Sequence, residues 1–115
     1  LKRKLKQAKS ADMIIVFTHY PFFINDFDEN ESYSNQSKKD RLKYFNLFEK
    51  YGVDAIYAGH LHNNAESSRN GIMMITTNAA GRPLGKAEPG YRLIKIVDGV
   101  INSDYIIYKN NRATE

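Results

Sequence analysis

The sequence predicts an α/β fold in which a parallel strand–helix–strand unit is followed by antiparallel strands. Two apolar runs, "MIIVFTH" (13–19) and "VDAIYAG" (53–59), are typical of strands that are covered on both faces. Between them, "KKDRLKYFNLFEKYG" (38–52) has the periodicity of an amphipathic helix. A helix that connects two neighbouring strands makes them parallel, so these three segments form a βαβ unit.

The elements on either side of this helix follow from local patterns. The chain begins within a helix, because Leu1, Leu5 and Ala8 recur at helical spacing. Residues 20–37 are mostly polar and predict a long loop between the first strand and the second helix. That helix is expected to bury one stripe and to end at Gly52; the stripe consists of Leu42, Phe45, Phe48 and Tyr51.

The last third of the chain shows strands without intervening helices. The expected strands are "GIMMITT" (71–77), "GYRLIKIVDG" (90–99) and "VINSDYIIYK" (100–109). The Asp98–Gly99 pair predicts a tight hairpin between the last two. We therefore expect an antiparallel segment after the βαβ unit.

Composition limits the classes to which the protein can belong. A chain of 115 residues suffices for one domain or part of one. No apolar run approaches the roughly 18 residues that a membrane span needs, so we expect no membrane partner. Without cysteines, any metal must be held by His, Asp, Asn or Glu. The chain begins at Leu1 with no readable targeting signal, which leaves cytoplasmic and periplasmic or secreted locations open.

All three histidines fall where predicted strands end. His19 ends the first strand, and His60 and His62 follow the second. The carboxyl ends of parallel strands share one edge of the sheet, which is where open α/β folds bind ligands. Gly59 can adopt backbone angles that turn both later histidines toward one site. Because neutral imidazole is a good ligand for Zn, Fe, Mn or Ni, the sequence predicts a metal site at this edge.

Two motifs give a resemblance to a known family. "THYPFF" (18–23) and "GHLH" (59–62) resemble the last two of the five motifs of the calcineurin-like metallophosphoesterases. "TTNAAGRPLGKAEPGYRLIKI" (76–96) resembles the C-terminal strands of one branch of that family, and "DENESYSN" (28–35) resembles its substrate-side loop. The resemblance covers nearly the whole chain and implies the C-terminal half of a four-layer αββα sandwich.

The resemblance also implies an activity and a set of site residues. It makes His19 and His60 ligands of one metal and His62 a ligand of a second, with Mn, Fe or Zn as the two divalent or trivalent ions. The implied enzyme hydrolyses phosphate monoesters or diesters with a metal-activated water. Tyr33, Asn35 and Arg82 are the expected contacts to the phosphoester substrate.

The family's first three motifs, D-x-H, G-D-x-x-D and G-N-H-D/E, are absent from this sequence. We therefore expect residues 1–115 to be the C-terminal portion of a single metallophosphoesterase domain whose N-terminal half is not in this chain. That half would supply the carboxylate ligands and would be the chain's natural partner. The isolated chain is expected to be inactive, marginally stable and self-associating, because covering strands are missing.

Two other segments resemble binding motifs but lack residues that those motifs need. "GRPLGKA" (81–87) lacks the spacing and the following Ser or Thr of a phosphate-binding P-loop, and "DFDENE" (26–31) lacks the glycine of a calcium loop.

The alternative to an enzyme is a non-catalytic basic module or metal-binding fragment that contacts nucleic acid or a protein, supported by the formal net charge of +4. In the leading interpretation, nucleic acid is not a partner.

Overall fold

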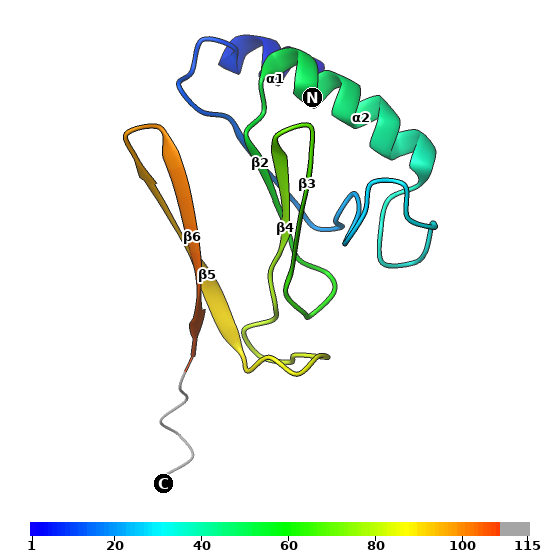
Figure 1. Ribbon diagram of the computed structural model, residues 1–115, viewed down its shortest axis with the longest axis vertical. Helices are drawn as coiled ribbons and strands as arrows, with labels where there is room; N and C mark the ends of the chain where they lie inside the picture. Colours follow the sequence, from blue (N-terminus) through cyan, green and yellow to red (C-terminus); the bar gives the residue numbers. More distant parts are fainter. Residues whose placement is uncertain (109–115) are drawn as a thin grey trace, which may run out of the picture.

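The computed structural model describes residues 1–108, which form two helices, a four-stranded sheet of order β1-β2-β4-β3 and a separate β5-β6 hairpin. Figure 1 shows the arrangement of these elements, with the hairpin set apart from the four-stranded sheet. The elements are α1 (Lys2–Ala8), β1 (Ile15–Thr18), α2 (Lys38–Tyr51), β2 (Ala55–Ala58), β3 (Ala65–Arg69), β4 (Ile72–Thr76), β5 (Gly90–Val97) and β6 (Val100–Ile107).

The predicted βαβ unit is present. β1 and β2 pair in parallel, with Ile15 opposite Ala55, and α2 connects them. The helix begins at Ser37, whose hydroxyl accepts a hydrogen bond from the backbone N–H of Asp40, and it ends at Gly52 with a left-handed φ of 73°. Among residues 1–108, no helix is long and apolar enough to cross a membrane.

The buried stripe of α2 differs from the prediction at one position. Leu42 is 54% exposed, whereas Arg41 is fully buried together with Phe45 and Phe48. The guanidinium of Arg41 donates hydrogen bonds to backbone carbonyls of the 20–37 loop, so its charge is not left without partners. The helix therefore faces the loop as well as the sheet.

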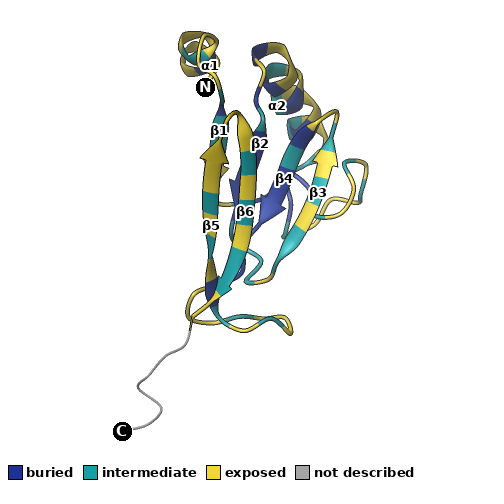
Figure 2. Ribbon diagram, turned by 60° about the vertical axis from the view of Figure 1, so that its left-hand side comes forward, coloured by how far each residue is buried: buried dark blue, intermediate teal, exposed yellow. Residues whose placement is uncertain are grey.

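The four-stranded sheet is covered on both faces at its centre. On one face, helix residues such as Phe45 pack with Ile56 and Met74, and on the other, Tyr57 and Ile75 pack against Ile94 of the hairpin. Figure 2 shows β2 and β4 as mostly buried strands and the hairpin as mostly exposed. The layers of helix, sheet and hairpin are compatible with one half of an αββα sandwich.

The expected antiparallel segment is only partly correct. β4 pairs in parallel with β2, and β3, which the sequence did not predict, pairs antiparallel with β4. The sequence of β3, "AESSR", does not alternate between apolar and polar residues. The strand lies at the edge of the sheet. A turn at Asn70–Gly71, both with positive φ, joins β3 to β4.

Two further expectations concern the first and last strands. β1 is not covered on both faces: Phe17 is 70% exposed and β1 forms an edge of the described sheet. The Asp98–Gly99 hairpin is confirmed, with φ angles of 49° and 75° in its turn. The predicted end of the last strand, Lys109, lies outside the described residues.

Candidate metal centre

Two of the three histidines meet at the carboxyl edge of the sheet. The backbone N–H of Gly59 donates to the carbonyl of His19 at 3.0 Å, which carries the β1–β2 pairing one step past the strands. The ring atoms His19 Nε2 and His60 Nδ1 then lie 3.3 Å apart. The predicted meeting of these two side chains at one edge is thus present in the geometry.

This spacing agrees with two ligands on one metal. Nitrogens about 2.0–2.1 Å from a tetrahedral ion lie about 3.4 Å from each other. The same 3.3 Å separation would also suit a hydrogen bond between the rings, in which one nitrogen carries the proton. The distance is therefore compatible with a shared cation as well as with a hydrogen bond between the rings.

The turn after β2 strains the histidines and not the glycine. His60 and His62 have φ angles of 67° and 52°, in the left-handed region that is uncommon for residues other than glycine. Gly59, which we expected to take such angles, is not among the residues with positive φ. Strain of this kind persists where the surrounding structure imposes it, and it gathers at functional sites.

His62 is held separately from the other two histidines. Its Nδ1 lies 2.7 Å from the backbone carbonyl of Arg82, and its own carbonyl accepts from the N–H of Leu84 at 2.8 Å. A carbonyl can only accept, so Nδ1 carries the proton, and in a neutral ring Nε2 then presents its lone pair. Metal-binding histidines commonly have this arrangement.

The convergence of three ligands on one point is not found. Within residues 1–108, no three or more His, Asp or Glu side chains are grouped so that they could hold a metal ion. The structure brings together His19 and His60 and leaves His62 on its own support. A metal at this edge would need further ligands from outside these residues.

Two tyrosines surround the ring of His60. The Tyr20 ring centroid lies 3.9 Å from that of His60, and the Tyr33 centroid lies 5.0 Å from it. A hydrogen bond with the Tyr33 phenol raises the pKa of Tyr20. Tyr33 is 81% exposed, so its hydroxyl is accessible beside the histidine pair, as a substrate contact requires.

The other two expected substrate contacts have different surroundings. Asn35 is 8% exposed and its amide donates to Glu29 Oε2 and to the carbonyl of Asn30, while its Oδ1 accepts from the N–H of Ser32. These bonds favour a structural role in the loop, and a substrate contact by Asn35 stays a prediction. Arg82 is exposed and contributes its carbonyl to His62.

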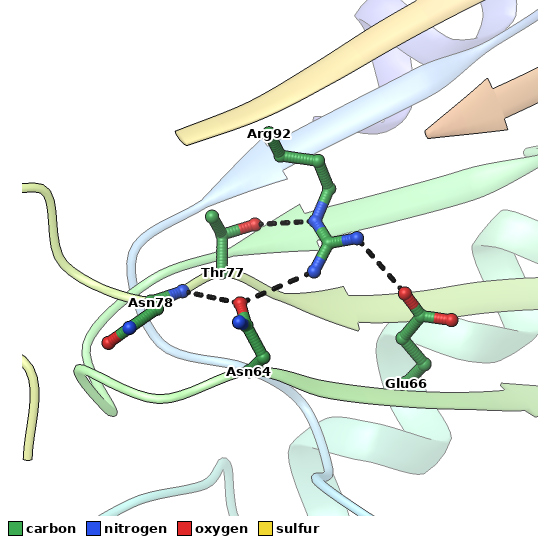
Figure 3. Close-up of polar contacts among 5 residues, drawn as sticks. All are labelled: Asn64, Glu66, Thr77, Asn78 and Arg92. Atoms are coloured by element: carbon green, nitrogen blue, oxygen red, sulfur yellow. Dashed lines mark hydrogen bonds and ion pairs between the residues drawn. The ribbon is translucent and has the colours of Figure 1, made fainter. Parts of the chain in front are cut away.

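A polar network around Arg92 was not predicted. Arg92 on β5 donates to Thr77 Oγ1, Glu66 Oε1 and Asn64 Oδ1, and the last of these also accepts from the N–H of Asn78 (Figure 3). The Arg92 side chain is almost completely buried. Its position in the alternation of β5, on the same face as Ile94, was the available signal that it points inward.

No family model matches the sequence. The serine/threonine-protein phosphatase CPPED1 of Rattus norvegicus is 32% identical over 105 residues, which are 91% of this chain and 32% of that protein. The Danio rerio protein is 32% identical over 107 residues (91% and 35%), and the Homo sapiens protein is 32% identical over 106 residues (91% and 32%). The chain thus spans about a third of the length of these curated relatives.

One solved structure shows the same fold. The Plasmodium protein described as "GAP50 the anchor in the inner membrane complex" superposes with a TM-score of 0.71 over 92% of this chain and 36% of that chain. The sequence identity is 21%, so this likeness concerns the fold alone. CPPED1 stands for calcineurin-like phosphoesterase domain-containing protein 1, the branch that residues 76–96 resemble.

Proposed function

Because the chain belongs to the calcineurin-like phosphoesterases, in the branch of CPPED1, we propose that it is the histidine-bearing portion of a metal-dependent phosphatase. His19 and His60 would hold one metal and His62 a second. When bound, a pair of Mn, Fe or Zn ions supplies an activated water and stabilises charge on the phosphoryl oxygens. The substrate is a phosphoester, and the relatives' name as serine/threonine-protein phosphatases favours a monoester.

The single observation that carries this proposal is the distance of 3.3 Å between His19 Nε2 and His60 Nδ1. Two neutral imidazoles with their nitrogens this close form a ready pair of ligands for a borderline metal ion. His62 adds a third nitrogen whose lone pair is fixed by the carbonyl of Arg82. Tyr33, whose ring lies 5.0 Å from that of His60, would contact a substrate phosphate through its hydroxyl.

The remaining metal ligands would come from the rest of the domain. We propose that this part packs on the hairpin side of β1. Phe17 is exposed there, and a cavity of about 380 Å³ opens between Phe17, Tyr57 and Arg92. The buried hydroxyl of Tyr57 has no hydrogen-bond partner among residues 1–108. Because the curated relatives are about three times as long as the matched region, they contain enough chain to cover this face.

The basic-module alternative is supported by the formal charge of +4 and by the absence of the family's first three motifs from this sequence, and we do not propose it. Titration with oligonucleotides at two salt concentrations would reveal it through a steep loss of affinity with salt.

Metal titration tests the proposal directly. Calorimetry with Zn²⁺ should show that His19→Ala and His60→Ala each lower affinity by about tenfold or more, because each removes a ligand. Tyr33→Phe is the matched control at the same edge and should leave Zn²⁺ affinity unchanged. Unaltered Zn²⁺ binding in both histidine variants would overturn the assignment. In a longer protein with the whole domain, His60→Ala should also abolish hydrolysis of an aryl phosphate.

A further inference from the structure

We propose that Asn78 is a positioning residue, which anchors residues 79–88 as a clamp that fixes the tautomer of His62. We call residues 79–88 the clamp loop. The effect on metal binding rests on the proposed function. The effect on the imidazole tautomer rests on the hydrogen bonds alone.

The clamp loop contacts His62 on two sides. The carbonyl of Arg82 accepts from Nδ1 of the ring at 2.7 Å, and the N–H of Leu84 donates to the backbone carbonyl of His62 at 2.8 Å. Neither contact comes from the strand that leads into His62. The orientation of the ring therefore depends on a segment 20 residues further along the chain.

Little else holds the middle of this loop. Gly81, Arg82, Leu84, Gly85 and Lys86 are all exposed, so burial of their side chains contributes little to its position. The loop lies directly on the turn that carries the histidines, since a Cβ added at Gly85 would come within 2.7 Å of the side-chain Cγ of Asn63. A loop with so few buried side chains must be fixed at its base.

Asn78 closes that base. Its Nδ2 lies 3.2 Å from the carbonyl of Ala87 and 3.1 Å from that of Glu88, and its Oδ1 accepts from the N–H of Ala79 at 2.8 Å. One side chain thus joins the first residue of the clamp loop to the last two. Asn78 is buried, so these bonds do not compete with water.

Two neighbours brace the same anchor. The hydroxyl of Tyr105 accepts from Asn78 Nδ2 at 3.0 Å and donates to the carbonyl of Glu88. On the other side, Asn64 Oδ1 accepts from the backbone N–H of Asn78 at 2.9 Å (Figure 3). Because Asn64 lies two residues after His62, the anchor also holds the end of the histidine turn.

The chemical consequence is a fixed proton position. With the clamp loop in place, Nδ1 of His62 must donate, and in the neutral ring Nε2 is the unprotonated nitrogen. If the base is released, the Arg82 carbonyl is no longer held opposite Nδ1, and the ring can exchange between its two neutral tautomers. In the second tautomer Nε2 carries the proton and cannot bind a metal. Only part of the protein then presents a free lone pair at Nε2.

The test follows the imidazole itself. Long-range ¹H–¹⁵N NMR on ¹⁵N-histidine-labelled protein at a pH where the ring is neutral reports which nitrogen of His62 is protonated. We expect the wild type to be in the Nδ1–H form, Asn78→Ala to be a mixture of tautomers, and Tyr105→Phe to lie between. The control Asn102→Ala removes an exposed amide on β6 and should match the wild type.

A folded Asn78→Ala protein with His62 still entirely in the Nδ1–H form would overturn the inference. If Asn78→Ala fails to fold, as judged by circular dichroism, Tyr105→Phe decides, and an unchanged tautomer there would overturn it too. In Zn²⁺ titrations we expect Asn78→Ala to weaken the binding that His62→Ala removes, by about tenfold. A shifted tautomer in Asn78→Ala, together with Zn²⁺ affinity that His62→Ala leaves unchanged, would support the clamp while refuting His62 as a metal ligand.

Discussion

His19 and His60 are 41 residues apart in the sequence, yet their Nε2 and Nδ1 atoms approach to 3.3 Å. The parallel pairing of β1 with β2 brings their backbones together, and a left-handed φ of 67° at His60 completes the approach. Such a conformation costs a residue other than glycine about 1 kcal/mol or more. The site and the stability of the fold therefore make opposite demands at this position.

This conflict predicts an unusual order of stability. His60→Gly should be more stable than His60→Ala by about 1 kcal/mol, because both lose the ring but only alanine keeps the strain. Urea unfolding measures the difference. The same pair at Asn46, on the exposed face of α2, is the control and should show the reverse order by a similar amount. Equal or greater stability of His60→Ala would contradict the strain.

Arg41 is expected to be essential for the 20–37 loop. Its Nη1 donates to the carbonyls of Phe27 and Glu29 at 2.8 and 2.6 Å, and its Nε donates to that of Gln36 at 2.9 Å. Arg41→Met keeps the aliphatic length but leaves these carbonyls without donors, so it should lower the free energy of unfolding by about 3 kcal/mol. Lys39→Met, on the exposed face of α2, should change it by less than about 0.5 kcal/mol. A similar small effect at Arg41 would show that the loop does not need it.

The forces that hold a residue decide whether its position can be predicted from the sequence. Apolar periodicity predicted α2 and a continuous apolar run predicted β2, because burial of side chains decides those elements. The last hairpin was predicted by its Asp98–Gly99 turn, because few residue pairs adopt the positive φ angles that such a turn needs. The apolar pattern of α2 wrongly assigned Leu42 to the core and omitted Arg41. Arg41 is buried because carbonyls distant in the sequence accept its hydrogen bonds, and an apolar pattern contains no information about such partners. The pairing of His19 with His60 followed from strand topology, whereas the separate support of His62 depends on a loop contact that no local pattern encodes.

Glu29 predicts a dependence of stability on pH. Burial alone would raise its pKa, but the backbone N–H groups of Asp26, Ile24 and Asn25 and the amide of Asn35 outweigh burial and hold the pKa below its usual value. The ionised side chain therefore stabilises the fold at neutral pH, and this contribution is lost as the pH falls below about 4.5 and through the lowered pKa.

The midpoint of urea unfolding, measured between pH 7 and pH 3, shows whether stability falls as Glu29 becomes protonated. Glu29→Gln should be less stable than the wild type at pH 7, and the difference should shrink as the pH falls. Asp12→Asn removes an exposed carboxylate elsewhere and should have little effect at pH 7. A difference between Glu29→Gln and wild type that stays constant with pH would refute the role of the charge.

Gly90 is the start of β5 and permits a close approach of the hairpin strands. A Cβ there would meet the backbone carbonyl of Ile106 and would lie 2.6 Å from Cζ of Tyr105. Gly90→Ala should therefore disturb the β5–β6 pairing and lower stability by about 2 kcal/mol, as overpacking does elsewhere. Gly81→Ala meets nothing within 4 Å and should be nearly neutral. Thermal unfolding followed by circular dichroism compares the two, and equal melting temperatures would contradict this packing.

Phe17 is expected to drive self-association of the 115-residue chain. It is 70% exposed on an edge strand and its ring stacks on Tyr57, so a second copy can bury apolar surface there. Phe17→Lys removes that gain and places a charge on the edge, which should weaken association at least about tenfold. Leu84→Lys alters a side chain of similar exposure, 71%, on the clamp loop, and should leave association unchanged. Sedimentation equilibrium at several concentrations measures both variants. A wild-type chain that stays monomeric throughout would mean that this face is stable without a cover, and the proposed packing of the rest of the domain on it would lose its main support.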